Sequence, residues 1–329
     1  MKEDADARTN RLPLHDNRDY LMVKVARMAY QQDSTLTEIA QETGLNRWQV
    51  SKLLQEAREL GIVRIEIVPR TLRHPDLETQ LTRTFGLRDA VVVPGPFDPP
   101  EGIEPVAQAA GYYLAAIKPR PTVLGVSWGR TMGAVAHWLP PRWADKVIVV
   151  QINGTVAPIP GVAHHNDVAE AFARKGNGKM IPLPVPAIVG ERLTREVLEK
   201  DRIVSDVLRS ARAAPLLVFS MGVAGERSVL LQSGNILPEE MSRLTRAGAV
   251  GDVLGHFINS RGEIVDAELD ARTVGLGLSD LKRRERVIGI AAGAAKQGVV
   301  LGALRAGLVN IIITDEATAR YALEHSHDR

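Results

Sequence analysis

The sequence predicts a small N-terminal helix-turn-helix domain, winged-helix-like, followed by a doubly wound, mostly parallel α/β domain. Two short amphipathic helical patterns joined by a glycine turn predict the first domain. Strand and helix patterns that alternate along the rest of the chain predict the second. A length of 329 residues with 45% apolar residues suits about two domains with packed cores. The expected boundaries are a disordered tail over 1–17, the helix-turn-helix domain over 18–70 and the α/β domain over 71–329.

The composition of the chain limits the compartment and the kinds of binding partner that we expect. The 41 basic and 39 acidic residues nearly balance, so any contact with nucleic acid must be local. Without cysteine there are no disulfides and no thiolate metal ligands, which is typical of a reducing compartment. Residues 1–17 lack the apolar core of a signal peptide, and no apolar run reaches membrane-spanning length. We therefore expect a soluble, cytoplasmic protein without a membrane partner.

The helix-turn-helix prediction rests on caps and spacing that agree. A first helix is expected over 19–31, and a second begins after a cap at Ser34 or Thr35. A tight turn over 43–45 leads to Asn46, which is the expected cap of a third helix. The third helix has apolar residues at helical spacing, at Val50, Leu53, Leu54, Ala57 and Leu60, and a strand or wing is expected over 62–68.

The exposed face of the third helix is the expected DNA-binding surface. Its first turn should meet base edges, whereas basic residues further along should touch phosphates. Eight basic and seven acidic residues over 18–70 leave a net charge of only +1, which favours several modules sharing one duplex. A small protein-interaction module is the alternative. The candidates are Arg47, Trp48 and Gln49 for base readout, Lys52 and Arg58 for phosphates, and Asn46 and Ser51 beside them.

The rest of the chain alternates between strand and helix patterns after an expected hinge over 69–75. Several strands are near-continuous apolar runs, which is typical of a parallel sheet covered on both faces. Strands are expected over 90–93, 122–126, 146–152, 216–220, 250–258, 287–292 and 309–313. Helices are expected over 76–85, 106–117, 130–139, 166–174, 194–199, 201–212, 238–247 and 294–305, and from Asp315 onward.

Four of the predicted strand ends carry small or polar residues, where ligands bind in open α/β sheets. The ends are 127–131, 153–155, 221–223 and 291–296. At the first, Ser127 leads through Gly129 to a helix start that suits an anion, although a tight corner would use the same residues.

Two single residues, Lys296 at the last of these ends and Asp252 in the segment 249–252, each allow two interpretations. Lys296 at another helix start indicates a compensating anion or a solvated cation. Asp252 could accept sugar hydroxyls or form a structural pair.

The sequence gives little indication of a nucleotide cofactor, a zinc site or a catalytic centre. The glycine spacing matches neither the dinucleotide fingerprint nor the P-loop, so no ATP, NAD or other cofactor is implied. His164 and His165 have no third ligand, so we expect no zinc, although His164 could hydrogen-bond a ligand. No nucleophile–base spacing appears, and only Asp252 or Glu226 could serve as a catalytic carboxylate. We therefore expect no enzyme.

The order of motifs resembles the SorC family of bacterial sugar-responsive transcriptional regulators, over nearly the whole chain. The motifs are the helix-turn-helix, Gly125–Thr131, Ile152–Gly154, Gly248–Asp252, Ala292–Lys296 and Ile313–Ala319. The resemblance implies an effector domain similar to glucosamine-6-phosphate deaminase and ribose-5-phosphate isomerase. It also implies phosphorylated sugar or polyol effectors, homodimers or homotetramers, operator DNA as a partner and, mostly, repression of catabolic operons.

Site residues carry over motif by motif. By resemblance the phosphate loop falls on Gly129, Arg130 and Thr131, although many members carry a smaller residue at the position of Arg130. Members also often place a polar side chain where this chain has Ala294 and Ala295. The residues implied around the sugar are Asn153, Gly154, Thr155, His164, Asp252 and Lys296.

Three functions are therefore in competition. The first is a DNA-binding regulator, a repressor of a carbohydrate catabolic operon, controlled by a phosphorylated sugar or polyol. The second is a sugar-phosphate isomerase or deaminase with an N-terminal interaction module, and the third is a sugar-binding protein without DNA contact. The helix-turn-helix pattern favours the first.

Overall fold

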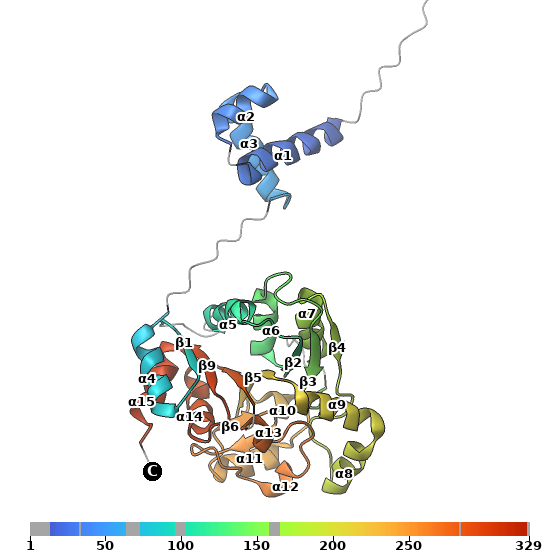
Figure 1. Ribbon diagram of the computed structural model, residues 1–329, viewed down its shortest axis with the longest axis vertical. Helices are drawn as coiled ribbons and strands as arrows, with labels where there is room; N and C mark the ends of the chain where they lie inside the picture. Colours follow the sequence, from blue (N-terminus) through green and yellow to red (C-terminus); the bar gives the residue numbers. More distant parts are fainter. Residues whose placement is uncertain are drawn as a thin grey trace, which may run out of the picture. The chain divides into compact units, whose positions relative to one another are not determined.

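The computed structural model describes residues 14–327 apart from 33, 64–72, 96–102, 158–164 and 283 (Figure 1). The chain divides into two compact units, with the boundary after Arg70. Among the described residues, no helix combines the length and the apolar character that crossing a membrane requires.

In its described part, the N-terminal unit has three helices around one apolar core. They are α1 (Leu14–Gln31), α2 (Leu36–Thr43) and α3 (Arg47–Glu59). An ion pair of 2.8 Å between Arg18 and Glu56 joins α1 to α3. The core is built from residues at helical spacing on all three helices: Met22, Val25, Met28, Ile39, Val50, Leu53, Leu54 and Ala57.

Local chemistry places the boundaries of α2 and α3. Thr35 caps α2 in a capping box with Glu38, and Gly44 ends that helix in the left-handed conformation at φ 70°. Asn46 and Gln49 form the second capping box, with both hydrogen bonds at 2.9 Å. The two helices and the turn therefore lie where the sequence predicts them.

The predicted ends of this unit need three corrections. The first helix begins at Leu14, five residues before its expected start. Leu60 lies beyond α3 and is 66% exposed, so it is no core residue. Ile62 and Val63 form a bend where a strand was expected, and residues 64–68 lie outside the described part of the chain.

A nine-stranded sheet is the centre of the second unit as far as the chain is described. Seven strands run parallel, and the hairpin β6–β7 is antiparallel, with β6 paired to the end of β5. The parallel order is β1 (Asp89–Val93), β9 (Ile311–Asp315), β8 (Arg286–Ile290), β5 (Leu216–Val223), β2 (Val123–Val126), β3 (Ile148–Gln151) and β4 (Lys179–Ile181). The predicted parallel α/β fold is confirmed.

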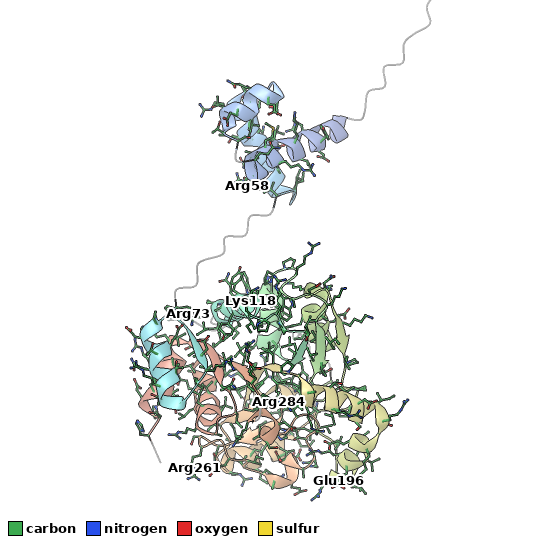
Figure 2. The ribbon with its side chains drawn as sticks, viewed as in Figure 1. Arg58, Arg73, Lys118, Glu196, Arg261 and Arg284 are labelled. Atoms are coloured by element: carbon green, nitrogen blue, oxygen red, sulfur yellow. The ribbon has the colours of Figure 1, made fainter. Side chains whose placement is uncertain are left out.

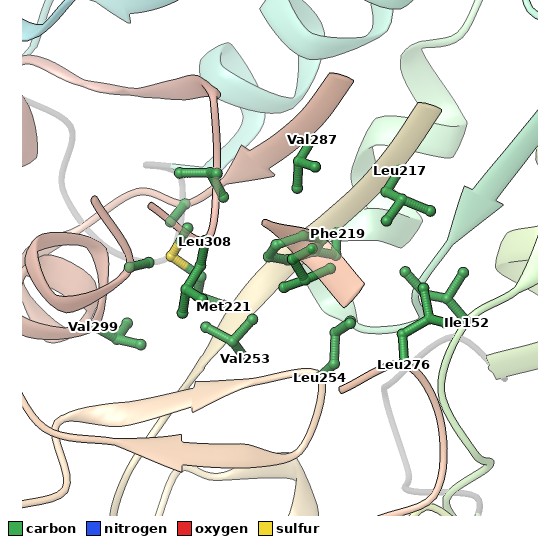
Figure 3. Close-up of a cluster of buried hydrophobic side chains, with 14 of the residues drawn as sticks. Ile152, Leu217, Phe219, Met221, Val253, Leu254, Leu276, Val287, Val299 and Leu308 are labelled. Atoms are coloured by element: carbon green, nitrogen blue, oxygen red, sulfur yellow. The ribbon is translucent and has the colours of Figure 1, made fainter. Parts of the chain in front are cut away.

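Helices cover both faces of the sheet. Alternate residues of a strand enter opposite cores: Leu217 and Phe219 of β5 enter one, and Val218 enters the other. Figure 3 shows the first of these cores. The helices that pack on this first core are α4 (Pro75–Phe85), α9 (Arg202–Ala213), α14 (Gln297–Arg305) and α15 (Glu316–Glu324). The helices of the second core are α5 (Glu104–Ala116), α6 (Arg130–Trp138) and α7 (His165–Lys175). The remaining helices are α8 (Arg192–Lys200), α10 (Val229–Gln232), α11 (Pro238–Arg246), α12 (Ala267–Asp270), α13 (Leu278–Leu281) and the 3₁₀ turn η2 (Ala294–Lys296).

Two strand predictions were wrong in detail. The single strand expected over 250–258 is a hairpin, β6 (Gly251–Val253) and β7 (His256–Ile258). The chain reverses at Leu254 and Gly255, which have φ of 56° and 93°. Strand β4 was not predicted at all. The hairpin matters because it carries Asp252 to the carboxyl end of β5.

Candidate effector-binding site

A cavity of about 420 Å³ opens at the carboxyl ends of β2, β3, β5 and β8. Ligands of open α/β sheets bind at this edge, outside the ends of the strands. The lining includes residues of all four predicted strand ends and of the β6–β7 hairpin. Seven predicted site residues lie together here: Ser127, Gly129, Arg130, Thr131, Asn153, Asp252 and Lys296.

Helix α6 begins at the cavity. Gly129 precedes it with φ 128°, a conformation that favours glycine, and within the described structure no side chain caps the helix start. Arg130 donates from Nη2 to the carbonyl of Arg227 at 3.2 Å, and both residues line the cavity. The positive end of the helix dipole therefore lies at the cavity beside a guanidinium group, an arrangement that suits an anion.

Lys296 brings a second cation to the same cavity. Its Nζ donates to Thr131 Oγ1 and to Ser220 Oγ, both at 3.1 Å. Burial lowers the pKa of Lys296 to about 8, and the nearby Asp252 opposes that shift. Gly293, at φ 92°, positions the preceding turn and donates to Asp315 Oδ2 at 2.7 Å. The ammonium group is thus held against the first turn of α6.

Asp252 is a buried carboxylate beside this cation. It lies opposite Gly222 in the β5–β6 pairing, and its Oδ2 accepts a hydrogen bond from the Gly255 amide at 2.9 Å. A side chain at Gly222 would overlap Asp252 Oδ1, so glycine is needed there. Burial raises the pKa of Asp252 to about 6, although Lys296 pulls it down. A carboxylate at the cavity wall can accept hydrogen bonds from ligand hydroxyls.

The end of β3 contributes Asn153 and a support for Trp128. The buried side-chain oxygen of Asn153 has no hydrogen-bond partner among the described residues. Trp128 donates from Nε1 to the Gly154 carbonyl at 2.6 Å, which fixes the indole at the cavity. Asn153 therefore offers an unused acceptor to a ligand, since buried polar groups are normally paired.

Two predicted effector residues, Gly154 and Thr155, do not lie in this lining. Gly154 packs against the main chain of Pro186, where a side chain would overlap the carbonyl. Thr155 donates from Oγ1 to the carbonyl of Val185 at 3.1 Å. His164 lies outside the described residues. Gly154 and Thr155 thus support the wall rather than form it.

Sequence reasoning also missed part of the lining. Ser220, which accepts from Lys296, was assigned only as the last residue of a strand. Arg227, Val229 and Leu230 come from a loop and short helix that carry no motif. Ser220 could have been found from its place at a strand end, whereas the others have no signal in the sequence.

Comparisons with known proteins agree with this geometry. Residues 70–324 match the Sugar-bind family model, "Putative sugar-binding domain". The deoxyribonucleoside regulator of Bacillus subtilis is 30% identical over 91% of this chain and 96% of its own length. The transcriptional regulator LsrR of Enterobacter sp. is 31% identical over 92% of each chain. The full-length sorbitol operon regulator SorC of Klebsiella pneumoniae has a TM-score of 0.75 and 27% identity, covering 93% of this chain and 98% of its own. The chain belongs to the SorC family of transcriptional regulators.

Membership in this SorC family favours a regulator over the isomerase or deaminase alternative. The resemblance inferred from the sequence motifs is therefore confirmed. Within the described residues, no group of three or more histidine, aspartate and glutamate side chains could hold a metal ion.

Helix α3 of this SorC-family chain has two kinds of polar residue on its surface. Asn46 and Gln49 are engaged with each other's backbone in the capping box, so the Gln49 side chain is committed to the helix start. Trp48 is 69% exposed, and Lys52 Nζ lies 5.2 Å from the centre of its ring. Arg47 and Ser51 are exposed.

Arg58, labelled in Figure 2, donates to the Leu54 carbonyl of its own helix. Among the described contacts, Arg47, Ser51 and Lys52 make no side-chain hydrogen bond, and these three exposed residues lie in the first two turns of α3.

Proposed function

We propose that this regulator binds operator DNA through α3 and is controlled by a phosphorylated sugar or polyol in the cavity. The proposal rests mainly on the position of Lys296. Its Nζ donates hydrogen bonds to Thr131, at the start of α6, and to Ser220 of β5. A half-buried ammonium, a guanidinium and a helix N-terminus suit a phosphate dianion. Asp252 and Asn153 are the proposed partners of the hydroxyls.

The direction of regulation is part of the proposal. We propose a cytoplasmic repressor of a carbohydrate catabolic operon that the effector releases from DNA. The sorbitol operon regulator among the structural neighbours supports the class of target. A ligand can shift such an equilibrium only through its different affinities for the two states.

A phosphate ester is expected to bind at least tenfold more tightly than its parent sugar. Each charge-assisted contact that the parent lacks contributes about 1.5–3 kcal/mol, and 1.4 kcal/mol is about a factor of ten. Calorimetry with a panel of sugar and polyol phosphates and their parents measures this ratio. The same panel is then added to a mobility shift with the gene's own upstream fragment. Equal affinities for ester and parent would remove the phosphate from the proposal.

A homo-oligomer, a dimer or tetramer, is the proposed assembly. The net charge of +1 over 18–70 predicts weak DNA binding by one module. Leu193 and Val197, one helical turn apart on α8, are 65% and 61% exposed, and Ile203 at the start of α9 is exposed too. Exposed apolar side chains that gather on one surface are typical of interfaces. Two ion pairs lie along α8, between Arg192 and Glu196 and between Arg195 and Glu199. Figure 2 labels Glu196 on this helix.

Leu193→Glu is expected to lower the oligomeric state in sedimentation at micromolar concentration. A carboxylate in an apolar interface loses its hydration, so assembly weakens. Leu237→Glu is the matched control, because Leu237 is 59% exposed at the start of α11, where an acidic residue is favourable. A native chain that sediments only as a monomer would contradict the proposed homo-oligomer. Unchanged assembly of the Leu193→Glu variant would show that the exposed apolar residues of α8 are not the interface.

A further inference from the structure

Two parts of the described cavity lining differ in their chemistry. Lys296, Thr131 and Ser220 form the hydrogen-bonded cationic part. Trp128, Val229 and Leu230 form an apolar wall, because all three belong to or pack against one cluster of buried hydrophobic residues.

The side chains of this wall have no free polar group to offer. The one polar side-chain atom in it, Trp128 Nε1, already donates to the Gly154 carbonyl at 2.6 Å. Val229 and Leu230 present only carbon from their side chains. A ligand hydroxyl against this wall would lose its hydrogen bonds to water without replacement, which is unfavourable. A ligand with hydroxyls on every side therefore fits only part of the cavity.

We propose that the effector carries an alkyl or aryl group in addition to its phosphate, and that this group packs on Trp128, Val229 and Leu230. The inference rests on the proposed function, since it takes the phosphate to lie at Lys296. A volume of about 420 Å³ is within the range of pockets that enclose most of a small ligand. Each methylene buried on the wall strengthens binding about fourfold.

Two phosphate monoesters of equal charge test the wall with the full chain. Hexyl phosphate has an apolar end, and glycerol 3-phosphate has hydroxyls in its place. Calorimetry is expected to give an affinity at least tenfold higher for hexyl phosphate. This comparison uses the native protein, so it does not depend on any variant folding.

Val229→Thr is expected to lower the ratio of the two affinities at least threefold, because it keeps the shape of the side chain and adds a hydroxyl to the wall. Val265→Thr is the matched control: Val265 packs on the same cluster and does not line the cavity. It should leave the ratio unchanged. Equal affinities for both esters, or an unchanged ratio in Val229→Thr, would overturn the apolar subsite and leave the phosphate site standing. If neither ester bound, the subsite and the phosphate site would both be overturned.

Discussion

Lys296→Ala is expected to weaken binding of a phosphorylated effector tenfold to a hundredfold and to leave DNA binding intact. The ammonium is a half-buried cation of the cavity lining, and losing one charge-assisted contact costs about 1.5–3 kcal/mol. Operator binding should persist, because the variant removes the ligand's preference for one state and no proposed DNA contact. Calorimetry measures the first effect, and mobility shifts with increasing effector measure the second.

Two further variants separate the loss of the Lys296 charge from the loss of its side-chain volume and from general effects of mutation. Lys296→Met keeps most of the volume, so it should lose as much affinity as Lys296→Ala if charge is responsible. Lys282→Ala is the matched control, since Lys282 is exposed in the same unit. Normal effector response in both Lys296 variants would place the anion elsewhere.

The pH dependence of binding gives the same prediction a second readout. Lys296 has its pKa lowered to about 8, so its ammonium is present below that pH and is lost as the pH rises through it. The second ionisation of a phosphate monoester lies near pH 6, so the dianion is present above it. Affinity should therefore be highest between about pH 6 and 8. The alkaline decline should disappear in Lys296→Met.

The parallel sheet could be predicted because its strands are apolar on both faces and separated by amphipathic helices. The β6–β7 hairpin could not, because its turn lies inside a mostly apolar segment from Val253 to Ile258, interrupted only by Gly255 and His256. Only Gly255 marks that turn, and Leu254 adopts a left-handed conformation that its residue type disfavours. Strand β4 has three residues, too few for a period to appear.

The candidate site was accessible to sequence reasoning where its residues follow strands directly. Gly129 and Lys296 are local signals at helix starts. Ser220 is separated from its partner Lys296 by 76 positions, and nothing in the chain connects them before it folds. Gln49 was assigned to base readout because it lies in the first turn of α3, but the same place makes it the partner of Asn46 in a capping box.

The capping role of Gln49 concentrates the expected base readout on Arg47. It is exposed at the first position of α3, where a recognition helix meets base edges. A bidentate contact between arginine and guanine is worth about 1–3 kcal/mol of discrimination. We therefore expect Arg47→Ala to weaken specific operator binding about fivefold to a hundredfold and to change non-specific binding little. Arg27→Ala, on the exposed surface of α1, is the matched control.

Lys52→Ala should affect DNA binding differently from Arg47→Ala, and comparing the two variants tests both assignments. Lys52 lies over the Trp48 ring on the second turn of α3, where a cation reaches phosphates and not bases. Its loss should lower affinity for operator and unrelated DNA alike and reduce the slope of log affinity against log salt by about one. Binding titrations of both DNAs at two salt concentrations separate the two effects. If Arg47→Ala kept the full ratio of specific to non-specific affinity, base readout would have to come from Trp48 or Ser51, two other exposed residues of these turns.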